Sequence, residues 1–480
     1  MPSGNCLDLW GLYPELLLAG LGILLVPIAG FGRGRWRMIP GVLFGIGLLV
    51  AMALTMRMLP WQDMAIFCGT YAVDGLAKGF KLILEVGAFI TLMLIFPYLR
   101  GQNQLAHAPV ALLFATLGAM GLASSQDLGL IVLFLQVMSL ASYLLVALVR
   151  SDMSSNEATL KYFIYAAAAL AIMAYGLTFL YGLSGSLDLR LIGRALQGAN
   201  RVWVGVAAGT VLIGYAFEAT LVPFHFWAPD VYQGTTAPVA GFLSVIPKIA
   251  GFAGLMRFLV LALPGTWLLW SLGIAILAAI TMSLGNLVAL RQTRLKRLLA
   301  YSSIAQAGYV LMAVAVVDRL PRALSAASYY LVAYLFMNLG AFVVVTQLER
   351  AIGNDEISAL SGLGRRVPGP ALVLALSLLS LAGIPPLAGF VAKVLVFQVV
   401  LDGGLVWLAV IAIANMVIGL YYYIAIIAQM YLKEPTWDLS LPGGLDYSIG
   451  AGLSLLGTFT LGILPSVILP LAELMSGIVR

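Results

Sequence analysis

Three titratable side chains lie inside long apolar stretches and could carry protons. They are Lys248 in 238–260, Lys393 in 370–400 and Glu218 in 202–222. A charge at the centre of a bilayer costs at least ~2.5–3.5 kcal/mol on insertion scales, so such a residue usually faces a bundle interior and has a function. Lys248 is the strongest candidate, because no acid stands near it in the stretch and desolvation disfavours the charged form of a lysine.

Each of these residues also has a structural interpretation. Lys248 could pair with a neighbouring helix purely for packing, and Lys393 could extend its side chain to the membrane surface. Glu218 alone would be protonated in a dry environment. Beside Lys248 it would be ionised, and the two would share one proton-dependent charge.

A second group of residues could extend a proton path. His225 lies in a proline-bounded break and could relay protons or cap a helix. Lys161 forms an i, i+4 pair with Glu157. Tyr301 and Gln306, with Ser302, Ser303 and Tyr309, would place hydroxyls and an amide along one helix, which suits ordered water but also ordinary packing between helices.

Other charges in the apolar stretches have weaker functional interpretations. Lys78, Lys81 and Glu85 fall at i, i+3 and i+7, on one helical face. We expect Lys78 at a helix end, Glu85 deeper, and Arg257 extended to the membrane surface.

The composition determines which elements position these residues. Of 480 residues, 62% are hydrophobic and 10% are charged, whereas a soluble domain carries about a quarter charged residues. Apolar stretches long enough to cross a bilayer recur from end to end, and they lack the alternation of barrel strands. We predict an all-α membrane protein with about fourteen transmembrane helices, at 9–29, 38–59, 75–98, 107–125, 127–149, 158–182, 202–222, 238–260, 266–290, 296–317, 322–348, 370–400, 404–431 and 446–470.

Two of the predicted spans are broken by proline. Span 7 ends before Pro223 and Pro229, and span 12 contains Pro385 and Pro386. Spans 4–8 and 9–13 form two five-helix blocks with the broken helix fourth in each, and an odd number of helices inverts the second copy, as in transporters. The predicted division is 1–106 (helices 1–3), 107–260 (first repeat), 261–431 (second, inverted repeat) and 432–480 (helix 14).

Basic residues are concentrated in the loops after odd-numbered spans. These are Arg33, Arg35, Arg37, Arg100, Arg150, Arg291, Arg294, Lys296, Arg297, Arg350, Arg365, Arg366 and Lys433. The positive-inside rule places these loops in the cytoplasm and both termini outside, most simply in a prokaryotic inner membrane. This distribution explains the net charge of +6 without nucleic-acid binding. Cys6 and Cys68 form no CxxC pair, which argues against an iron–sulfur site, a structural zinc or a disulfide framework.

Several motifs resemble the antiporter-like subunits of proton-pumping NADH:quinone oxidoreductase (complex I), and the family of subunit N most closely. The most specific is Pro-Phe-His-Phe-Trp-Ala-Pro-Asp-Val-Tyr-Gln-Gly at 223–234. Others are Lys-Arg-Leu-Leu-Ala-Tyr-Ser-Ser at 296–303, Glu-Ala-Thr-Leu-Lys-Tyr at 157–162 and Leu-Ala-Gly-Ile-Pro-Pro at 381–386.

This resemblance implies a proton-translocating membrane-arm subunit, part of an oxidoreductase but without a catalytic redox centre or cofactor of its own. Flavin, iron–sulfur clusters and quinone would belong to partner subunits, and neighbours resembling subunits M and K are expected. The alternatives are a subunit of a multi-subunit cation/proton antiporter, a subunit of a membrane-bound hydrogenase, or a structural scaffold.

The resemblance places a glutamate in span 5, lysines in spans 7, 8 and 12, and a histidine in span 10. Lys248 and Lys393 match the lysines of spans 8 and 12. Gln136, Glu218 and Gln306 stand at the other three positions. An amide and an acid thus replace an acid–base pair. Either Glu218 pairs with Lys248 and preserves transport, or this unit serves as a hydrated or structural conduit.

Overall fold

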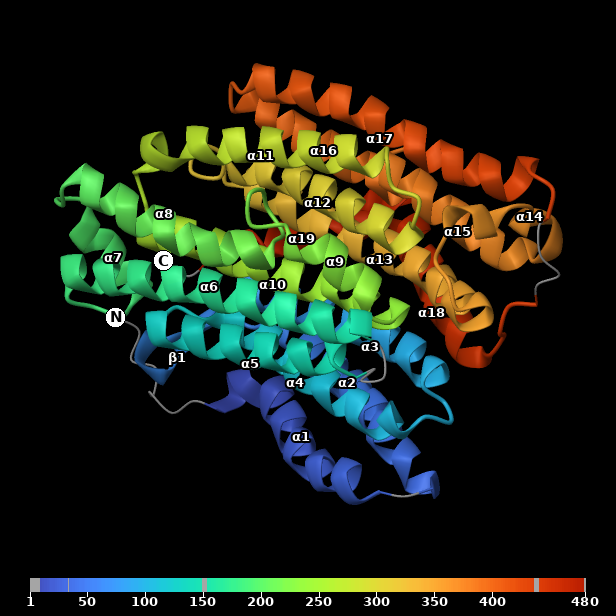
Figure 1. Ribbon diagram of the computed structural model, residues 1–480. Coiled ribbons are helices and arrows are strands. Elements are labelled where there is room, and N and C mark those ends of the chain that lie inside the picture. The colour runs from blue at the N-terminus through green and yellow to red at the C-terminus, as the bar shows by residue number, and fades with distance from the viewer. Residues whose placement is uncertain (1–8, 33, 149–152, 436–439, 479–480) are drawn as a thin grey trace.

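The computed structural model describes residues 9–478 apart from 33, 149–152 and 436–439, and this part of the chain is almost entirely helical (Figure 1). Cys6, Arg33, Arg150 and Arg480 lie outside the described residues. The first half contains α1 (Tyr13–Phe31), α2 (Ile39–Met58), α3 (Gly75–Tyr98), α4 (His107–Ser124), α5 (Leu128–Val146), α6 (Met153–Ser184), α7 (Leu189–Leu196), α8 (Arg201–Glu218), α9 (Trp227–Gly234) and α10 (Ala237–Ala262).

The second half contains α11 (Trp267–Ala289), α12 (Leu295–Val314), α13 (Arg322–Ile352), α14 (Leu363–Arg366), α15 (Pro368–Ala382), α16 (Ala388–Asp402), α17 (Val406–Leu432), α18 (Leu445–Ile463) and α19 (Leu469–Leu474). Short 3-10 helices are η1 (Leu9–Leu12), η2 (Gly34–Met38), η3 (Phe67–Gly69), η4 (Asn103–Ala106), η5 (Ile357–Leu360) and η6 (Pro465–Val467). Strands β1 (Met64–Ile66) and β2 (Tyr71–Val73) form an antiparallel hairpin with Met64 opposite Val73.

The all-α membrane fold predicted from composition is confirmed. Within the described residues, ten helical segments are long and apolar enough to cross a membrane: those of α1, α2, α3, α4, α5, α6, α10, α11, α13 and α17. Helix α3 coincides with the predicted span 75–98. Helices also cover the remaining predicted spans, and the chain breaks at both predicted proline sites, between α8 and α9 and between α15 and α16.

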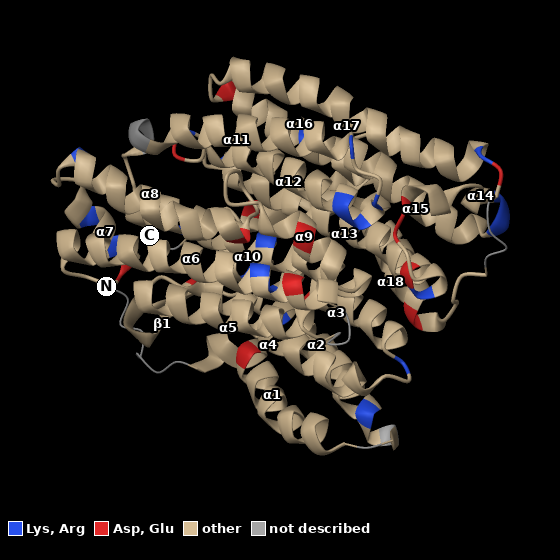
Figure 2. Ribbon diagram, viewed as in Figure 1, with Lys and Arg blue, Asp and Glu red and all other residues tan. Residues whose placement is uncertain are grey.

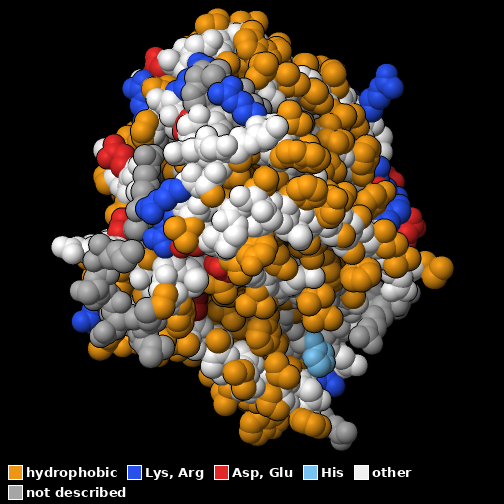
Figure 3. Space-filling view, turned by 90° about the vertical axis from the view of Figure 1, so that its left-hand side faces the viewer, with side chains coloured by type: hydrophobic (Ala, Val, Ile, Leu, Met, Phe, Trp, Pro, Cys, Tyr) orange, Lys and Arg blue, Asp and Glu red, His pale blue; other side chains and the backbone are white. Residues whose placement is uncertain are grey.

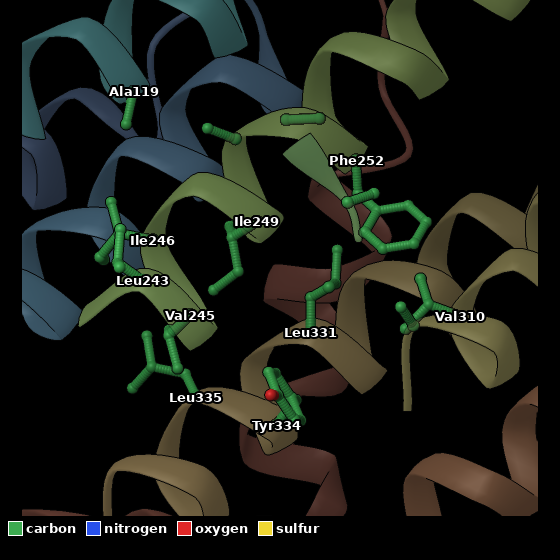
Figure 4. Packing of buried hydrophobic residues seen from close by; sticks show 14 of the residues in the cluster. Ala119, Leu243, Val245, Ile246, Ile249, Phe252, Val310, Leu331, Tyr334 and Leu335 are labelled. Atoms are coloured by element: carbon green, nitrogen blue, oxygen red, sulfur yellow. The ribbon is translucent and has the colours of Figure 1, made fainter. Parts of the chain in front are cut away.

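Helices α10 and α13 form the centre of the bundle. In each, 94% of the most apolar window is buried, against 33% for α6 and for α17. Figure 4 shows Val245 and Ile249 of α10 near Leu331, Tyr334 and Leu335 of α13. The face drawn in Figure 3 is covered largely by hydrophobic side chains, which suits contact with lipid or apolar partners.

A buried ion pair ties the start of α3 to the end of α10. Both guanidinium nitrogens of Arg257 donate to the carboxylate of Asp74 at 2.7 Å, and both side chains are fully buried. Asp74 also accepts from the backbone nitrogen of Ala77 and caps α3. The prediction that Arg257 extends to the membrane surface was therefore wrong, because an acid brought in by another helix satisfies it inside the bundle.

The three charged residues on one face of α3 are also buried and partnered. Lys78 lies 3.0 Å from Asp63, Lys81 lies 2.6 Å from Glu15, and Glu85 accepts from the hydroxyl of Thr55. Lys78 lies in the first turn of α3, at the helix end as expected, but it is buried instead of facing outward. These contacts join α3 to α1, α2 and the loop before β1, and Figure 2 shows charged residues inside the bundle as well as in the loops.

The expectation for the cysteines was also wrong. Cys68, in η3, is disulfide-bonded. The only other cysteine of the sequence, Cys6, lies outside the described residues. The absence of a CxxC pair was a poor guide, because a cross-link depends on distance in space and not on spacing in the sequence.

The Asp74–Arg257 pair generates a stability prediction. Asp74→Asn retains a side chain that can cap α3 but leaves a buried guanidinium without a counter-charge, so we expect it to destabilise the fold by ~3–5 kcal/mol. Thermal unfolding of the purified protein in detergent measures the loss. The double change Asp74→Asn with Arg257→Met should recover part of it, and a double variant less stable than Asp74→Asn alone would contradict the interpretation.

Candidate functional site

The first helix break ends α8 directly after Glu218. Thr220 adopts a positive φ of 58°, unusual for a β-branched residue, and the helix ends there, with the backbone nitrogen of Leu221 bonded to the carbonyl of Ala216. The break is held by hydrogen bonds from other elements. The indole of Trp227 donates to the carbonyl of Phe217, and the hydroxyl of Thr281 accepts from the backbone of Val222. These partners replace those that the helix would have supplied.

Glu218 is buried at this break with one hydrogen bond. The hydroxyl of Ser139 in α5 donates to it at 3.0 Å, and its second carboxyl oxygen has no hydrogen-bond partner. Glu218 and Gln136 line one cavity of about 10 Å³, which is room for roughly one water. The structure therefore brings together two of the three residues that depart from the family pattern.

Glu218 does not pair with Lys248. No ion pair joins them in the described part of the chain, and the first of our two hypotheses is wrong in that form. Glu218 packs against α10 at Gly251. A Cβ added to Gly251 would lie 2.9 Å from the Cβ of Glu218. The carboxylate and the ammonium belong to different surroundings: Glu218 contacts α5, whereas Lys248 contacts α12.

The second break creates a binding place for Lys393. Helix α15 ends at Gly383, whose φ of 89° permits the capping bonds from Gly383 and Ile384 back to Leu379. The carbonyls of Leu381 and Ala382 have no partner within the helix. The ammonium of Lys393, from α16, donates to them at 2.9 and 2.8 Å. A cation at a helix C-terminus is also stabilised by the helix dipole.

Lys248 occupies the middle of the bundle and is 1% exposed. Its ammonium donates to the carbonyl and hydroxyl oxygens of Ser303 in α12, at 2.6 and 2.5 Å. It also lies 5.4 Å from the ring centroid of Tyr334, whose hydroxyl donates to the same serine. Neutral oxygens and an aromatic ring thus replace an acidic partner.

A second hydrogen-bonded group surrounds Lys393 and meets the group around Lys248 at the adjacent residues Ser302 and Ser303 of α12. Beside Ser303, Ser302 bonds with Tyr423 of α17. The amide nitrogen of Gln306 contacts both the hydroxyl of Tyr423 and the carbonyl of Leu381 that also accepts from Lys393. The amide oxygen of Gln306 accepts from Tyr330. We call this set the central polar network: Lys248, Ser302, Ser303, Gln306, Tyr330, Tyr334, Leu381, Ala382, Lys393 and Tyr423.

The remaining candidates lie outside this network. His225 is buried in the first break, and its Nδ1 has no hydrogen-bond partner. Tyr301 is half-buried on α12. Lys161 lies nearer the surface, 2.7 Å from Glu157 and 2.8 Å from Asp230, which also pairs with Arg297. Lys161 and Arg297 therefore hold α6 and α12 against α9.

Sequence reasoning missed the polar residues of α13. Tyr330, Tyr334 and Asn338 are buried and face the network or its neighbours. Their spacing of i, i+4 and i+8 puts them on one helical face, and that pattern within an apolar span was a usable signal. The carbonyls of Leu381 and Ala382 left only the indirect signal of the prolines that follow.

Residues 125–419 match the family described as "NADH:quinone oxidoreductase/Mrp antiporter, TM". The chain is 38% identical over 475 residues to NADH-quinone oxidoreductase subunit N 2 of Roseiflexus castenholzii, with 96% of this chain and 94% of the relative covered. It is 40% identical over 467 residues to NADH-quinone oxidoreductase subunit N of Moorella thermoacetica, with 94% and 95% covered.

Solved structures give the same result. A chain of respiratory complex I from Thermus thermophilus matches with a TM-score of 0.83 and 33% identity, covering 96% of this chain and 99% of the other. A chain of the Mrp complex from Dietzia sp. DQ12-45-1b matches with a TM-score of 0.87 at 22% identity, covering 98% and 96%, and this second likeness concerns the fold alone.

The contact between Gly383 and Lys393 generates a second prediction. A Cβ at Gly383 would lie 2.8 Å from Cδ of Lys393. Gly383→Ala should therefore lower stability in thermal unfolding through both its positive φ and this clash, the clash alone contributing ~1–3 kcal/mol.

Gly185 supplies the matched control. It has a positive φ of 68°, and a Cβ added there would have nothing within 4 Å of it, so Gly185→Ala carries the backbone cost alone. Adding Lys393→Ala, which removes the clashing Cδ, to Gly383→Ala should reduce the excess cost, as expected for coupled residues. Equal effects of Gly383→Ala and Gly185→Ala would show that the contact with Lys393 is unimportant.

Proposed function

The chain belongs to the NADH:quinone oxidoreductase/Mrp antiporter family, and we propose that it is a subunit N-type component of a complex I-type NADH:quinone oxidoreductase that contributes a proton-translocation path. One observation carries the proposal of a path. Lys248 and Lys393 are buried, neither has an acidic partner at ion-pair distance among the described residues, and the hydrogen-bonded groups around them meet at the adjacent residues Ser302 and Ser303 of α12. A bundle built only for stability has no need of this arrangement, because apolar side chains would fill the space at lower cost.

The oxygens around each lysine suit proton exchange. Serine carbonyl and hydroxyl oxygens hold the ammonium of Lys248, and helix-end carbonyls hold that of Lys393. Such acceptors stabilise the protonated lysine but do not fix its charge as a carboxylate would. Hydroxyls of Ser303 and Tyr334 can both donate and accept hydrogen bonds. Water reaching this network, driven by redox events in partner chains, would therefore change where the proton rests.

The membrane topology forms part of the proposal. The proposed topology has fourteen spans, with α8 and α9 counted as one and α15 and α16 as another. Ten of these spans form two inverted five-helix repeats at 107–260 and 261–431. Both ends of the described chain pack at the start of α3, Gly11 beside Val73 and Leu474 beside Gly75. This proximity supports an even number of crossings and, with the basic loops, both termini outside a prokaryotic inner membrane.

The electron carriers and neighbours belong to other chains in this proposal. Flavin, iron–sulfur clusters and quinone would be bound by partner subunits, because this chain has only two cysteines and two histidines. Neighbours resembling subunits M and K would contact its apolar outer faces. A cation/proton antiporter or membrane-bound hydrogenase is the alternative assembly. Purifying the native complex and identifying its chains by mass spectrometry distinguishes the two: flavin and iron–sulfur subunits support the oxidoreductase.

Replacing Lys248 provides the main test. Lys248→Met keeps side-chain length but removes the titratable amine, so we expect fewer protons pumped per electron while quinone reduction continues. Proteoliposomes containing the assembled complex allow both rates to be measured together. The control is Lys433→Met, an exposed lysine beyond α17, which should change neither. An unchanged proton-to-electron ratio in Lys248→Met would overturn the proposed path.

Glu218 provides a separate test of whether this unit pumps at the first break. If Glu218 exchanges a proton through the cavity shared with Gln136, Glu218→Gln should lower the proton-to-electron ratio, because an amide cannot be protonated there. If the unit is a conduit, the ratio should stay the same. Gln136→Asn changes the cavity without changing charge and serves as the comparison.

A further inference from the structure

A polar crevice opens at the end of the bundle where α9 turns into α10. Its volume is about 440 Å³, and its lining includes the exposed residues Arg294 and Glu356 and the less exposed residues Thr235, Lys296, Glu349 and Asp355. Arg294 and Glu356 are exposed, whereas Lys296 is buried. The crevice therefore leads from the surface to a charged floor inside the protein.

The floor is an ion pair that four segments share. The ammonium of Lys296 lies 2.8 Å from the carboxylate of Glu349 and donates to the carbonyl of Thr235 at 2.7 Å. Glu349 accepts from the hydroxyl of Tyr98 and the backbone nitrogen of Ala237. The pair thus fastens α12, α13 and α3 to the first residue of α10, the helix that carries Lys248.

Beyond this floor, polar groups near Lys248 come from three helices. On α10, Ser244 lies seven residues beyond Ala237, and on α12 Ser303 lies seven beyond Lys296. Seven residues rise about 10.5 Å. On α13, Asn338 donates to Ser244 at 2.5 Å, and its own amide oxygen is buried without a hydrogen-bond partner. One turn further along α10 stands Lys248.

The unpartnered oxygen of Asn338 indicates where solvent would be held. Buried polar atoms nearly always have a hydrogen-bond partner, protein or water, and this one lies between the crevice floor and the central polar network. When Lys296 and Glu349 are paired, they close the floor and neutralise each other. When they separate, two desolvated charges attract water, because a buried charge without a partner is costly.

We propose that the Lys296–Glu349 ion pair is a gate that controls water access from the crevice to Lys248. The inference rests on the proposed function, because it supplies the path that a proton would take to the central polar network. Separation of the pair would admit water as far as Ser244 and Asn338, and re-formation of the pair would exclude it.

Solvent access to Ser244 measures the gate without depending on pumping. In the assembled complex, we would follow the reaction of the thiol introduced by Ser244→Cys with a small, charged methanethiosulfonate reagent. Adding Glu349→Gln or Lys296→Met should raise the labelling rate on the order of tenfold. Such an increase requires only a small decrease in the activation free energy of the labelling reaction. The charge exchange Lys296→Glu with Glu349→Lys should lower it again.

Two controls separate a gate from loss of structure. The thiol introduced by Ser328→Cys is buried near the other end of α13 and should remain protected in every variant. Glu434→Gln removes an exposed ion pair with Arg365 and should leave labelling at Ser244→Cys unchanged. Unchanged labelling at Ser244→Cys in the Glu349 and Lys296 variants, or an equal rise at both thiols, would overturn the gate.

A different result would contradict the proposed function. If Lys248→Met leaves the proton-to-electron ratio unchanged but Glu349→Gln still opens the path to Ser244→Cys, the gate stands and the pumping role of Lys248 does not. If Lys248→Met lowers the proton-to-electron ratio but labelling of Ser244→Cys never changes, the pumping role of Lys248 stands and the gate does not.

Discussion

The arrangement of this bundle depends on one constraint: a polar group inside an apolar bundle must find its partner within the protein. Helix breaks make such partners available, because they release backbone carbonyls that a continuous helix would use. Lys393 is held in this way by the end of α15. Lys248 has no adjacent break and instead uses the carbonyl and hydroxyl of Ser303. Both lysines are therefore stabilised by neutral oxygens, and their surroundings leave the charge adjustable.

The buried charges divide into two classes by their partners. Arg257 and Lys81 face carboxylates within ion-pair distance, and each joins helices at one end of the bundle. Lys248 and Lys393 face dipoles and aromatic rings. Removing a partner from the first class leaves an uncompensated charge and costs stability. The second class can change its charge more freely, and this difference separates the structural residues from the candidate path.

Periodicity and composition predicted most of the fold, because hydropathy is a local property. The prolines at 223, 385 and 386 predicted both breaks. The contacts between buried charged side chains were predicted poorly, because packing brings together residues that are far apart in the sequence. Arg257 meets Asp74 across 183 positions of sequence, and nothing local to either residue indicates the pair. The motif comparison had the same limit: it identified Gln136 and Glu218 as departures, but only the structure places them around one small cavity.

That cavity changes how the departure is interpreted. In the family pattern the acid and the base neutralise each other when both are ionised. Here, Glu218 has a single hydroxyl donor, Ser139, and an amide nearby. No base in the described residues compensates its charge at ion-pair distance, so protonation or a bound solvent molecule must do so. In the proposed function, control of water access would be the step by which redox chemistry in partner chains acts on Glu218 and on the central polar network.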